Sequence, residues 1–303
     1  MFKITNGGLL KREPKYTGLI FGQPGTGKST LAVSASRPLL IDLDLGAQRI
    51  ATKDRARADI VICESLNELN EIITAPELKN YDTIIIDTFG QIIDLIIRDK
   101  FRGSMSPGKW GIIKSDFMQI VNTLRMAGKS VLFLAHESEE KNDEKIIKRP
   151  QCQGKAKDEL MKVLDFIGYL HSGINGGRIL EFGEDESFYA KNTYGFKAKY
   201  VLPDVKVNQN DFWAAVIEKQ IADFIAEQEV ADQELYGKIC TLENEIKKIK
   251  SIPEIEKFLE TLKDDDSLST GAILKLKKSV IEQAEQNNII YDSEQKKWIE
   301  KKD

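Results

Sequence analysis

The segment from Gly22 to Ser29 (Gly-Gln-Pro-Gly-Thr-Gly-Lys-Ser) has the residue types and the spacing that bind phosphate groups. It fits the pattern G-x-x-x-x-G-K-[ST] and lies between a short apolar run and a stretch with helical spacing. Glycines allow backbone N–H groups to turn toward phosphates, and the following helix presents its positive end. We expect Lys28 to reach the β- and γ-phosphates and the Ser29 hydroxyl to ligate Mg²⁺. The motif therefore predicts a site for ATP and Mg²⁺ formed by Gly22, Gln23, Pro24, Gly25, Thr26, Gly27, Lys28, Ser29 and Thr30.

Asp87 ends the apolar run Thr83-Ile-Ile-Ile and is followed by Thr88. A carboxylate at the end of a buried strand beside a phosphate loop is the expected second partner of Mg²⁺. Aspartate is also favoured as a helix N-cap, so a capping role is the alternative, and the two roles are compatible. We predict that Ser29 and Asp87 form the metal-binding pair.

Asp42 and Asp44 follow the apolar run Leu39-Leu-Ile, and alternation along a strand points both to the same side. Hydrolysis of a nucleoside triphosphate needs a carboxylate that orients or deprotonates the attacking water. We predict this catalytic role for Asp44. Asp42 as the base and a pair of solvated loop aspartates are the alternatives.

His136 follows the apolar run from Ser130 to Ala135, at the edge of a parallel sheet where ligands bind. There it would sense the γ-phosphate and transmit its presence to the loop that follows. A purely structural histidine is the alternative.

Two segments after these strands are rich in Lys and Arg, residues 98–114 and 141–157. Basic residues interleaved with glycines and an aromatic ring suit a single-stranded nucleic acid, because charge holds the phosphates and the ring stacks on a base. Two solvated surface loops are the alternative, with Trp110 as an anchor that packs its loop against the core. The residues predicted to bind DNA are Arg102, Lys109, Trp110, Lys148, Arg149 and Lys155.

The elements that position these residues alternate between apolar, strand-like runs and helical spacing. This pattern predicts an α/β fold with a mostly parallel sheet and helices on both faces. Beyond Asp211 the pattern changes to about four helices without a strand. We therefore predict a core over residues 1–205 and an acidic helical region over 206–303. The predicted strands are 18–22, 39–42, 83–87, 130–135 and 163–170, with an edge hairpin over 178–182 and 187–190.

Composition bounds the function classes. The chain has 303 residues and a net charge of −4, and its 41% hydrophobic content is typical of globular proteins. The three cysteines are far apart and there are only two histidines, which argues against a disulfide framework or a zinc site. No apolar run reaches the length of a membrane span and the N-terminus lacks a signal-peptide core, so we expect an intracellular protein without membrane contact.

The order of these motifs resembles a known family. The phosphate loop, Ile41-Asp-Leu-Asp, Ile-Ile-Ile-Asp87-Thr, Leu-Ala-His136, a basic segment and a hairpin ending Ala-Lys191-Asn together resemble the RecA-like core. Within that group they are most similar to the phage-encoded, RecA-like single-strand annealing recombinases. The resemblance covers about residues 16–200 and not the helical tail.

The resemblance implies an ATPase that pairs DNA strands in the cytoplasm of a bacterial host and works beside single-strand-binding protein as a homo-oligomeric ring or filament. By position it implies catalytic roles for Lys28, Asp44 and His136. It also implies that Lys191 reaches the ATP of a neighbouring subunit, although Thr193 replaces the second basic residue of that pattern. The alternative function is an ATP-dependent switch that loads a replication partner, such as a helicase, through the acidic tail.

Overall fold

The computed structural model describes residues 11–104, 106–142, 145–153, 156–173, 176–183, 185–263 and 265–301. The chain divides into two compact units. One, the sheet unit, runs from Glu13 to Phe224, and the other combines the residues up to Arg12 with those from Ile225 onward. Lys155, a predicted DNA-binding residue, lies outside the described residues.

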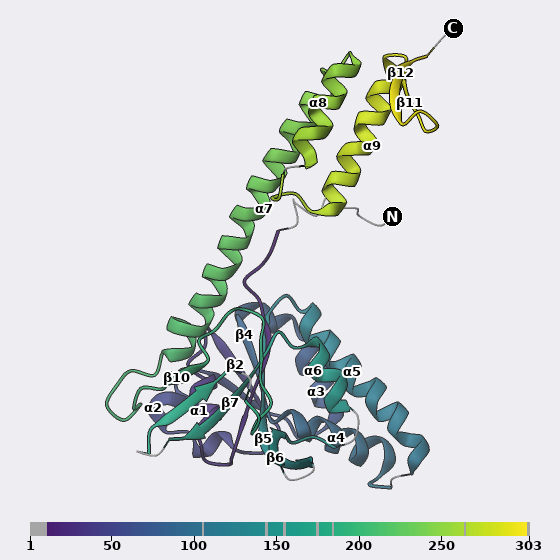
Figure 1. Ribbon diagram of the computed structural model, residues 1–303. Helices are drawn as coiled ribbons and strands as arrows, with labels where there is room; N and C mark the ends of the chain where they lie inside the picture. The colour runs from purple at the N-terminus through teal and green to yellow at the C-terminus, as the bar shows by residue number, and fades with distance from the viewer. Residues whose placement is uncertain are drawn as a thin grey trace. The chain divides into compact units, whose positions relative to one another are not determined.

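The sheet unit is built on a 10-stranded sheet with a parallel centre (Figure 1). The strand order is β10-β8-β7-β1-β5-β4-β2-β3, with β6 paired to β5 and β9 paired to β7. Every residue of β1, β2 and β4 is buried, as expected of parallel strands covered on both faces. The predicted α/β class is therefore confirmed. The strands are β1 (Thr17–Gly22), β2 (Pro38–Asp42), β3 (Asp59–Ile62), β4 (Thr83–Asp87), β5 (Ser130–Asn142), β6 (Lys145–Pro150), β7 (Phe166–Ser172), β8 (Arg178–Glu181), β9 (Lys191–Asn192) and β10 (Lys199–Val201).

Helices cover the sheet, with α3, α5 and α6 on one side of the strands and α1 and α2 on the other (Figure 1). In α4, Ile92, Ile93 and Ile96 are fully buried, as their helical spacing predicts. Within the described part of the chain, no helix is long and apolar enough to cross a membrane. The helices are α1 (Lys28–Ala32), α2 (Thr52–Arg55), α3 (Leu66–Thr74), α4 (Phe89–Phe101), α5 (Trp110–Met126) and α6 (Ala156–Val163).

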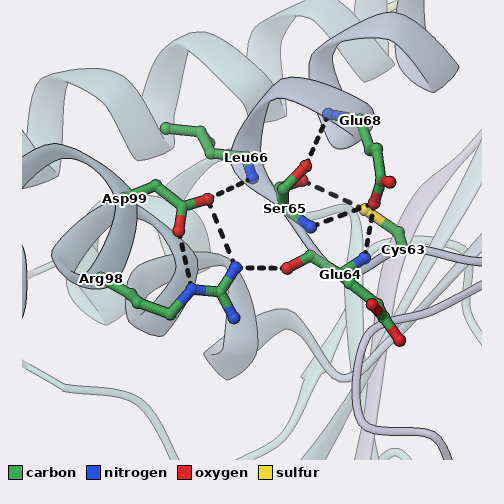
Figure 2. A network of polar contacts seen from close by, with 7 residues as sticks. All are labelled: Cys63, Glu64, Ser65, Leu66, Glu68, Arg98 and Asp99. Atoms are coloured by element: carbon green, nitrogen blue, oxygen red, sulfur yellow. Dashed lines mark hydrogen bonds and ion pairs between the residues drawn. The ribbon is translucent and has the colours of Figure 1, made fainter.

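A polar network fixes the start of α3 to the end of α4 (Figure 2). The Ser65 hydroxyl accepts a hydrogen bond from the Glu68 N–H (3.2 Å), and the Glu68 carboxylate accepts one from the Ser65 N–H (3.2 Å), which forms a capping box. Asp99 in α4 accepts a hydrogen bond from the Leu66 N–H (2.7 Å) and pairs with Arg98 (2.7 Å). Arg98, in the first basic segment, is thus engaged within the fold.

The two basic segments include regular secondary structure. Most of residues 98–114 is helical, because α4 continues to Phe101 and α5 begins at Trp110. The second segment includes a β-ribbon, which we define as Glu137–Asn142 of β5 together with β6. Within this β5–β6 ribbon Glu139 lies opposite Lys148. Opposite charges across an antiparallel pair stabilise it, and this pairing between strands cannot be recognised from a count of Lys and Arg.

The edge of the sheet also differs from the prediction. The predicted strand 163–170 is displaced, because α6 extends to Val163 and β7 begins at Phe166. Residues 187–190 form no strand, and β8 pairs instead with β7 and β10. The edge strand β3 was not predicted, because its residues are only partly buried and lack a long apolar run.

The sheet unit extends beyond the boundary predicted at residue 205. It includes the π-helical segment η5 (Trp213–Glu218) and the start of α7 (Lys219–Ile246). Trp213 is fully buried and its Nε1–H donates a hydrogen bond to the Tyr16 hydroxyl (2.7 Å). The Glu218 carboxylate accepts hydrogen bonds from Tyr16 (2.9 Å) and Thr83 (3.0 Å). Part of the predicted tail therefore completes the core of the sheet unit.

The second unit has its own hydrophobic cluster, which includes buried residues of α7, α8 (Ile252–Lys263) and α9 (Thr270–Gln286). A hairpin of β11 (Ile289–Asp292) and β12 (Lys297–Glu300) follows, so the prediction of a tail without strands is wrong. Ile289 and Trp298 belong to the cluster. These two residues anchor the hairpin to the cluster. The Lys and Glu residues around them interrupt the apolar–polar alternation by which a strand is recognised in a sequence.

Replacing Trp213 by alanine tests whether η5 is part of the core. Trp213→Ala should lower the free energy of unfolding by about 3–5 kcal/mol, because it leaves a cavity and removes the hydrogen bond from Trp213 to the Tyr16 hydroxyl. Denaturant unfolding followed by circular dichroism measures the change. Trp110→Ala is the matched control, since Trp110 is 36% exposed. Equal losses in the two variants would contradict the assignment of Trp213 to the core.

Candidate functional site

The carboxyl ends of the central strands bring the predicted nucleotide-site residues together. Gly22 at the end of β1 lies opposite His136 of β5, and Asp42 at the end of β2 lies opposite Asp87 at the end of β4. Parallel strands end at one edge, which is where ligands bind in α/β proteins. One pocket at this edge joins the loop to the predicted metal and catalytic residues. It is lined by Pro24, Gly25, Gly27, Lys28, Ser29, Thr30, Asp44, Gly46, Arg49, Ile50, Asp87 and His136.

The phosphate loop has the backbone conformation that its glycines allow. Gly25 and Gly27 have φ angles of 81° and 84°, in the left-handed region that favours glycine. The Lys28 ammonium is buried and donates hydrogen bonds to the carbonyls of Gly22 and Gln23 (2.9 Å each). Burial lowers the pKa of this ammonium, and the nearby carboxylates, first among them Asp87, act in the opposite direction. The carbonyls of the loop therefore hold the Lys28 ammonium in place. Phosphate oxygens would replace these two carbonyls when a nucleotide binds.

The predicted metal pair is in direct contact. The Ser29 hydroxyl donates a hydrogen bond to Oδ2 of Asp87 (2.5 Å), and burial raises the pKa of Asp87 to about 6. The N-cap of α4 is Thr88, so Asp87 does not cap that helix. A hydroxyl and a carboxylate are hard oxygen donors that suit Mg²⁺, which keeps several waters and binds substrate phosphates. Among the described residues no group of three or more His, Cys, Asp or Glu could hold a metal, so Mg²⁺ would need those waters and phosphates.

Asp42 and Asp44 have different environments. The carboxylate of Asp42 is buried and accepts hydrogen bonds from the N–H groups of Gly46 (3.0 Å) and Ala47 (2.9 Å), which fixes the loop after β2. Asp44 lines the pocket, and its Oδ2 lies 3.8 Å from Nε2 of His136. The neighbouring His136 lowers the pKa of the Asp44 carboxyl. The geometry thus gives Asp42 a structural task, whereas Asp44 lines the pocket together with Asp87.

Two buried polar atoms in this pocket lack hydrogen-bond partners among the residues that the structure describes. They are Oδ1 of Asp44 and Nδ1 of His136. Buried polar groups are nearly always paired, so two orphans side by side indicate a place for a polar ligand or water. This observation supports the prediction that Asp44 and His136 face a substrate.

The predicted DNA-binding residues in the first segment are partly available. Arg102 and Trp110 are exposed and flank the turn between α4 and α5. Lys109 is half-buried, donates to the Ser104 carbonyl (2.8 Å) and lies 5.1 Å from the centre of the Phe101 ring. The turn therefore presents one arginine and one ring to solvent.

The cations of the β5–β6 ribbon are engaged with neighbouring groups. Lys148 donates a hydrogen bond to the Tyr169 hydroxyl (3.0 Å) and lies 3.7 Å from the Glu137 carboxylate. Arg149 pairs with Glu140 (2.8 Å). Lys148 and Arg149 thus each have a carboxylate beside them, which reduces the charge that these two residues offer to a phosphate backbone.

Lys191 has a structural place within its own subunit. Its ammonium donates to the carbonyl of Leu164, close to the carbonyls of Met161 and Lys162 at the C-terminal end of α6. It does not line the pocket at the phosphate loop.

Several pocket residues were not predicted. Arg49 and Ile50 line the pocket because Asp42 folds the chain after β2 back toward the loop. Arg178 of β8 reaches the phosphate loop, since a Cβ built on Gly27 would lie 2.9 Å from its Nη1 atom. No motif marks either arginine in the sequence. The one available signal was their charge near predicted strand ends.

Comparison with known proteins agrees with this geometry. A family model described as an AAA domain matches residues 14–194, which is more than half of the chain. No curated protein matches this chain. Among solved structures, the crystal structure of the RadB recombinase is similar, with 15% identity, a TM-score of 0.37, and coverage of 55% of this chain and 79% of that chain. The phosphate loop and the family match together show that this chain belongs to the AAA-domain family.

Proposed function

We propose that the protein is a Mg²⁺-dependent ATPase that binds single-stranded DNA and promotes annealing or strand pairing in phage recombination. The observation that carries the ATPase part is the single pocket that contains Lys28, the Ser29–Asp87 pair and the carboxylate of Asp44. These groups supply a cation for the phosphates, oxygen donors for Mg²⁺ and a base for water.

The chemistry assigns one task to each side chain. Lys28 would exchange the carbonyls of Gly22 and Gln23 for the β- and γ-phosphate oxygens of ATP. Mg²⁺, held by Ser29 and Asp87, would neutralise the developing phosphate charge. Asp44 would orient or deprotonate the attacking water, because it lines the pocket beside the phosphate loop. His136, whose Nε2 lies 3.8 Å from Oδ2 of Asp44, would sense the γ-phosphate.

The DNA part of the proposal is supported by the position and exposure of basic and aromatic residues. The ribbon begins directly after His136, and the exposed Arg102 and Trp110 lie at the end of α4 and the start of α5. Trp110 would stack on a base and Arg102 would hold a phosphate. The remaining proposals are a homo-oligomeric ring or filament, with Lys191 facing a neighbouring ATP, and single-strand-binding protein as a partner in the bacterial cytoplasm.

The alternative function, a switch that loads a replication partner, is favoured by two observations. The ribbon cations Lys148 and Arg149 are paired with Glu137 and Glu140. The second unit has its own hydrophobic cluster, as a module that binds a protein partner would need. Direct binding of single-stranded DNA separates the two functions.

Conservative replacements test the two aspartates. Asp44→Asn should retain ATP binding and lose hydrolysis by about 10²–10⁴-fold, because it removes the base and preserves the shape. Asp42→Asn should instead lower the free energy of unfolding by about 1.5–3 kcal/mol, because it weakens two hydrogen bonds from N–H groups to a charged oxygen. Phosphate release and thermal unfolding measure the two effects. Normal hydrolysis by Asp44→Asn would refute its role as the base.

Single-stranded oligonucleotide binding tests the α4–α5 turn. Trp110→Ala should weaken binding by about 1–3 kcal/mol for all sequences alike, because it removes one stacked base. Arg102→Ala should reduce the slope of log K against log salt by about 0.7, because it removes one phosphate contact. Fluorescence anisotropy at several salt concentrations measures both. Arg57→Ala is the matched control, since Arg57 is exposed and precedes the edge strand β3, outside both basic segments. Undetectable binding by the wild type would favour the loading function instead.

A further inference from the structure

A series of hydrogen-bonded side chains connects the phosphate loop to the β5–β6 ribbon. The Gln23 amide donates a hydrogen bond to Oε1 of Glu137 (3.1 Å), and the Tyr169 hydroxyl donates one to Oε2 (3.0 Å). Lys148 donates to the same hydroxyl (3.0 Å) and lies 3.7 Å from the Glu137 carboxylate. The Glu137 side chain is only 8% exposed, so these contacts are strengthened by the limited access of water.

The loop end of this series is sensitive to nucleotide. Gln23 contributes its side chain to Glu137 and its carbonyl to Lys28 (2.9 Å) and to the Thr26 hydroxyl (2.9 Å). ATP would draw the Lys28 ammonium away from this carbonyl and toward the phosphates. Gln23, one of the two residues that would lose a bond to Lys28 on nucleotide binding, therefore also binds Glu137.

The ribbon end is firmly attached. The Lys148 N–H donates to the Ser187 carbonyl (2.8 Å), and the Tyr189 N–H donates to the Lys148 carbonyl (3.0 Å). The Tyr169 ring is stacked on Phe188, with centroids 4.9 Å apart. A change in Glu137 can therefore reach the backbone of β6 through a tyrosine whose ring is held in place.

We infer that Gln23, Glu137, Tyr169 and Lys148 form a positioning network that couples occupancy of the phosphate loop to the position of the β5–β6 ribbon. The inference rests on the nucleotide binding proposed above. It uses a route that differs from the contact between Asp44 and His136, because none of its four members touches the orphaned atoms of that pair. In the nucleotide-free state the Glu137 carboxylate retains Lys148. Nucleotide binding alters this contact and changes the availability of the ammonium.

The coupling must be reciprocal. If ATP changes the affinity of the ribbon for a phosphate backbone, DNA must change the affinity for ATP by the same factor. Couplings of this kind typically amount to roughly 5- to 150-fold in affinity. The network therefore predicts a property that can be measured from either end.

Tyr169→Phe is the sharpest test, because it removes the central hydroxyl and keeps the ring. Hydrogen exchange of ribbon amides is measured with and without a non-hydrolysable ATP analogue and Mg²⁺, a readout that needs no DNA. In the wild type the analogue should change the exchange rates of peptides covering 137–150 severalfold. In Tyr169→Phe this response should be lost while the variant still binds the analogue. Tyr189→Phe, which removes a neighbouring hydroxyl outside the network, should respond like the wild type.

A second variant distinguishes loss of the coupling from destabilisation of the protein by Tyr169→Phe. Lys148→Met keeps an apolar stem on the Tyr169 ring and removes the ammonium, and it should also abolish the response. In parallel, the ratio of oligonucleotide affinities with and without the analogue should fall toward unity in both variants. The inference is overturned if the wild type binds the analogue but the hydrogen-exchange rates of its ribbon amides stay the same. It is also overturned if both variants respond to the analogue as the wild type does.

Failure of the proposed function gives a different result. If the wild type binds no single-stranded DNA but its ribbon responds to the analogue through Tyr169, the DNA proposal fails and the coupling stands. If the wild type does not bind the analogue, both proposals fail.

Discussion

Burial of opposite charges at the carboxyl end of a parallel sheet is the constraint on which the rest of the site depends. Lys28 and Asp87 are only 6% and 4% exposed. Transferring charged groups out of water is costly unless they are hydrogen-bonded or paired. The chain meets this cost with the carbonyls of Gly22 and Gln23 for the cation and with the Ser29 hydroxyl for the carboxylate. In the proposed function, Mg²⁺ and triphosphate would replace these partners.

The fold explains why these residues meet. They come from four separate strands and would remain far apart without the register that places Asp42 beside Asp87 and Gly22 beside His136. The core beneath them is filled by β-branched and aromatic residues of the same strands. A substitution in the middle of β4, far from the nucleotide, would thus change the position of Asp87 as well as the stability of the sheet.

The sequence was most informative where chemistry requires a local pattern. The phosphate loop needs glycines at fixed positions before a lysine, and the central strands need continuous apolar runs, so both were predicted correctly. The ribbon, β3 and the C-terminal hairpin were not predicted, because their stability comes from partners distant in the chain. Glu139 lies opposite Lys148 on the other strand of the ribbon, and Trp298 packs into a hydrophobic cluster formed by distant helices. Trp213 looked like part of the tail until its contact with Tyr16 placed it in the core.

The choice between Asp42 and Asp44 required the backbone. Both follow the same strand, and because alternation points both side chains to the same side, it does not distinguish them as candidates for the catalytic base. Two N–H groups bind Asp42, whereas Asp44 has a buried oxygen without a partner in the described part of the chain.

The most direct test of the central claim is a calorimetric titration of the wild-type chain and of Lys28→Ala with a non-hydrolysable ATP analogue, with and without Mg²⁺. The wild type should bind with one-to-one stoichiometry, and binding with Mg²⁺ should be at least about tenfold tighter, which corresponds to about 1.4 kcal/mol. Lys28→Ala should lose most of this affinity, because it removes the buried ammonium that faces the phosphates. Equal affinities in the two chains, or binding that ignores Mg²⁺, would show that the pocket at the phosphate loop is not a nucleotide site.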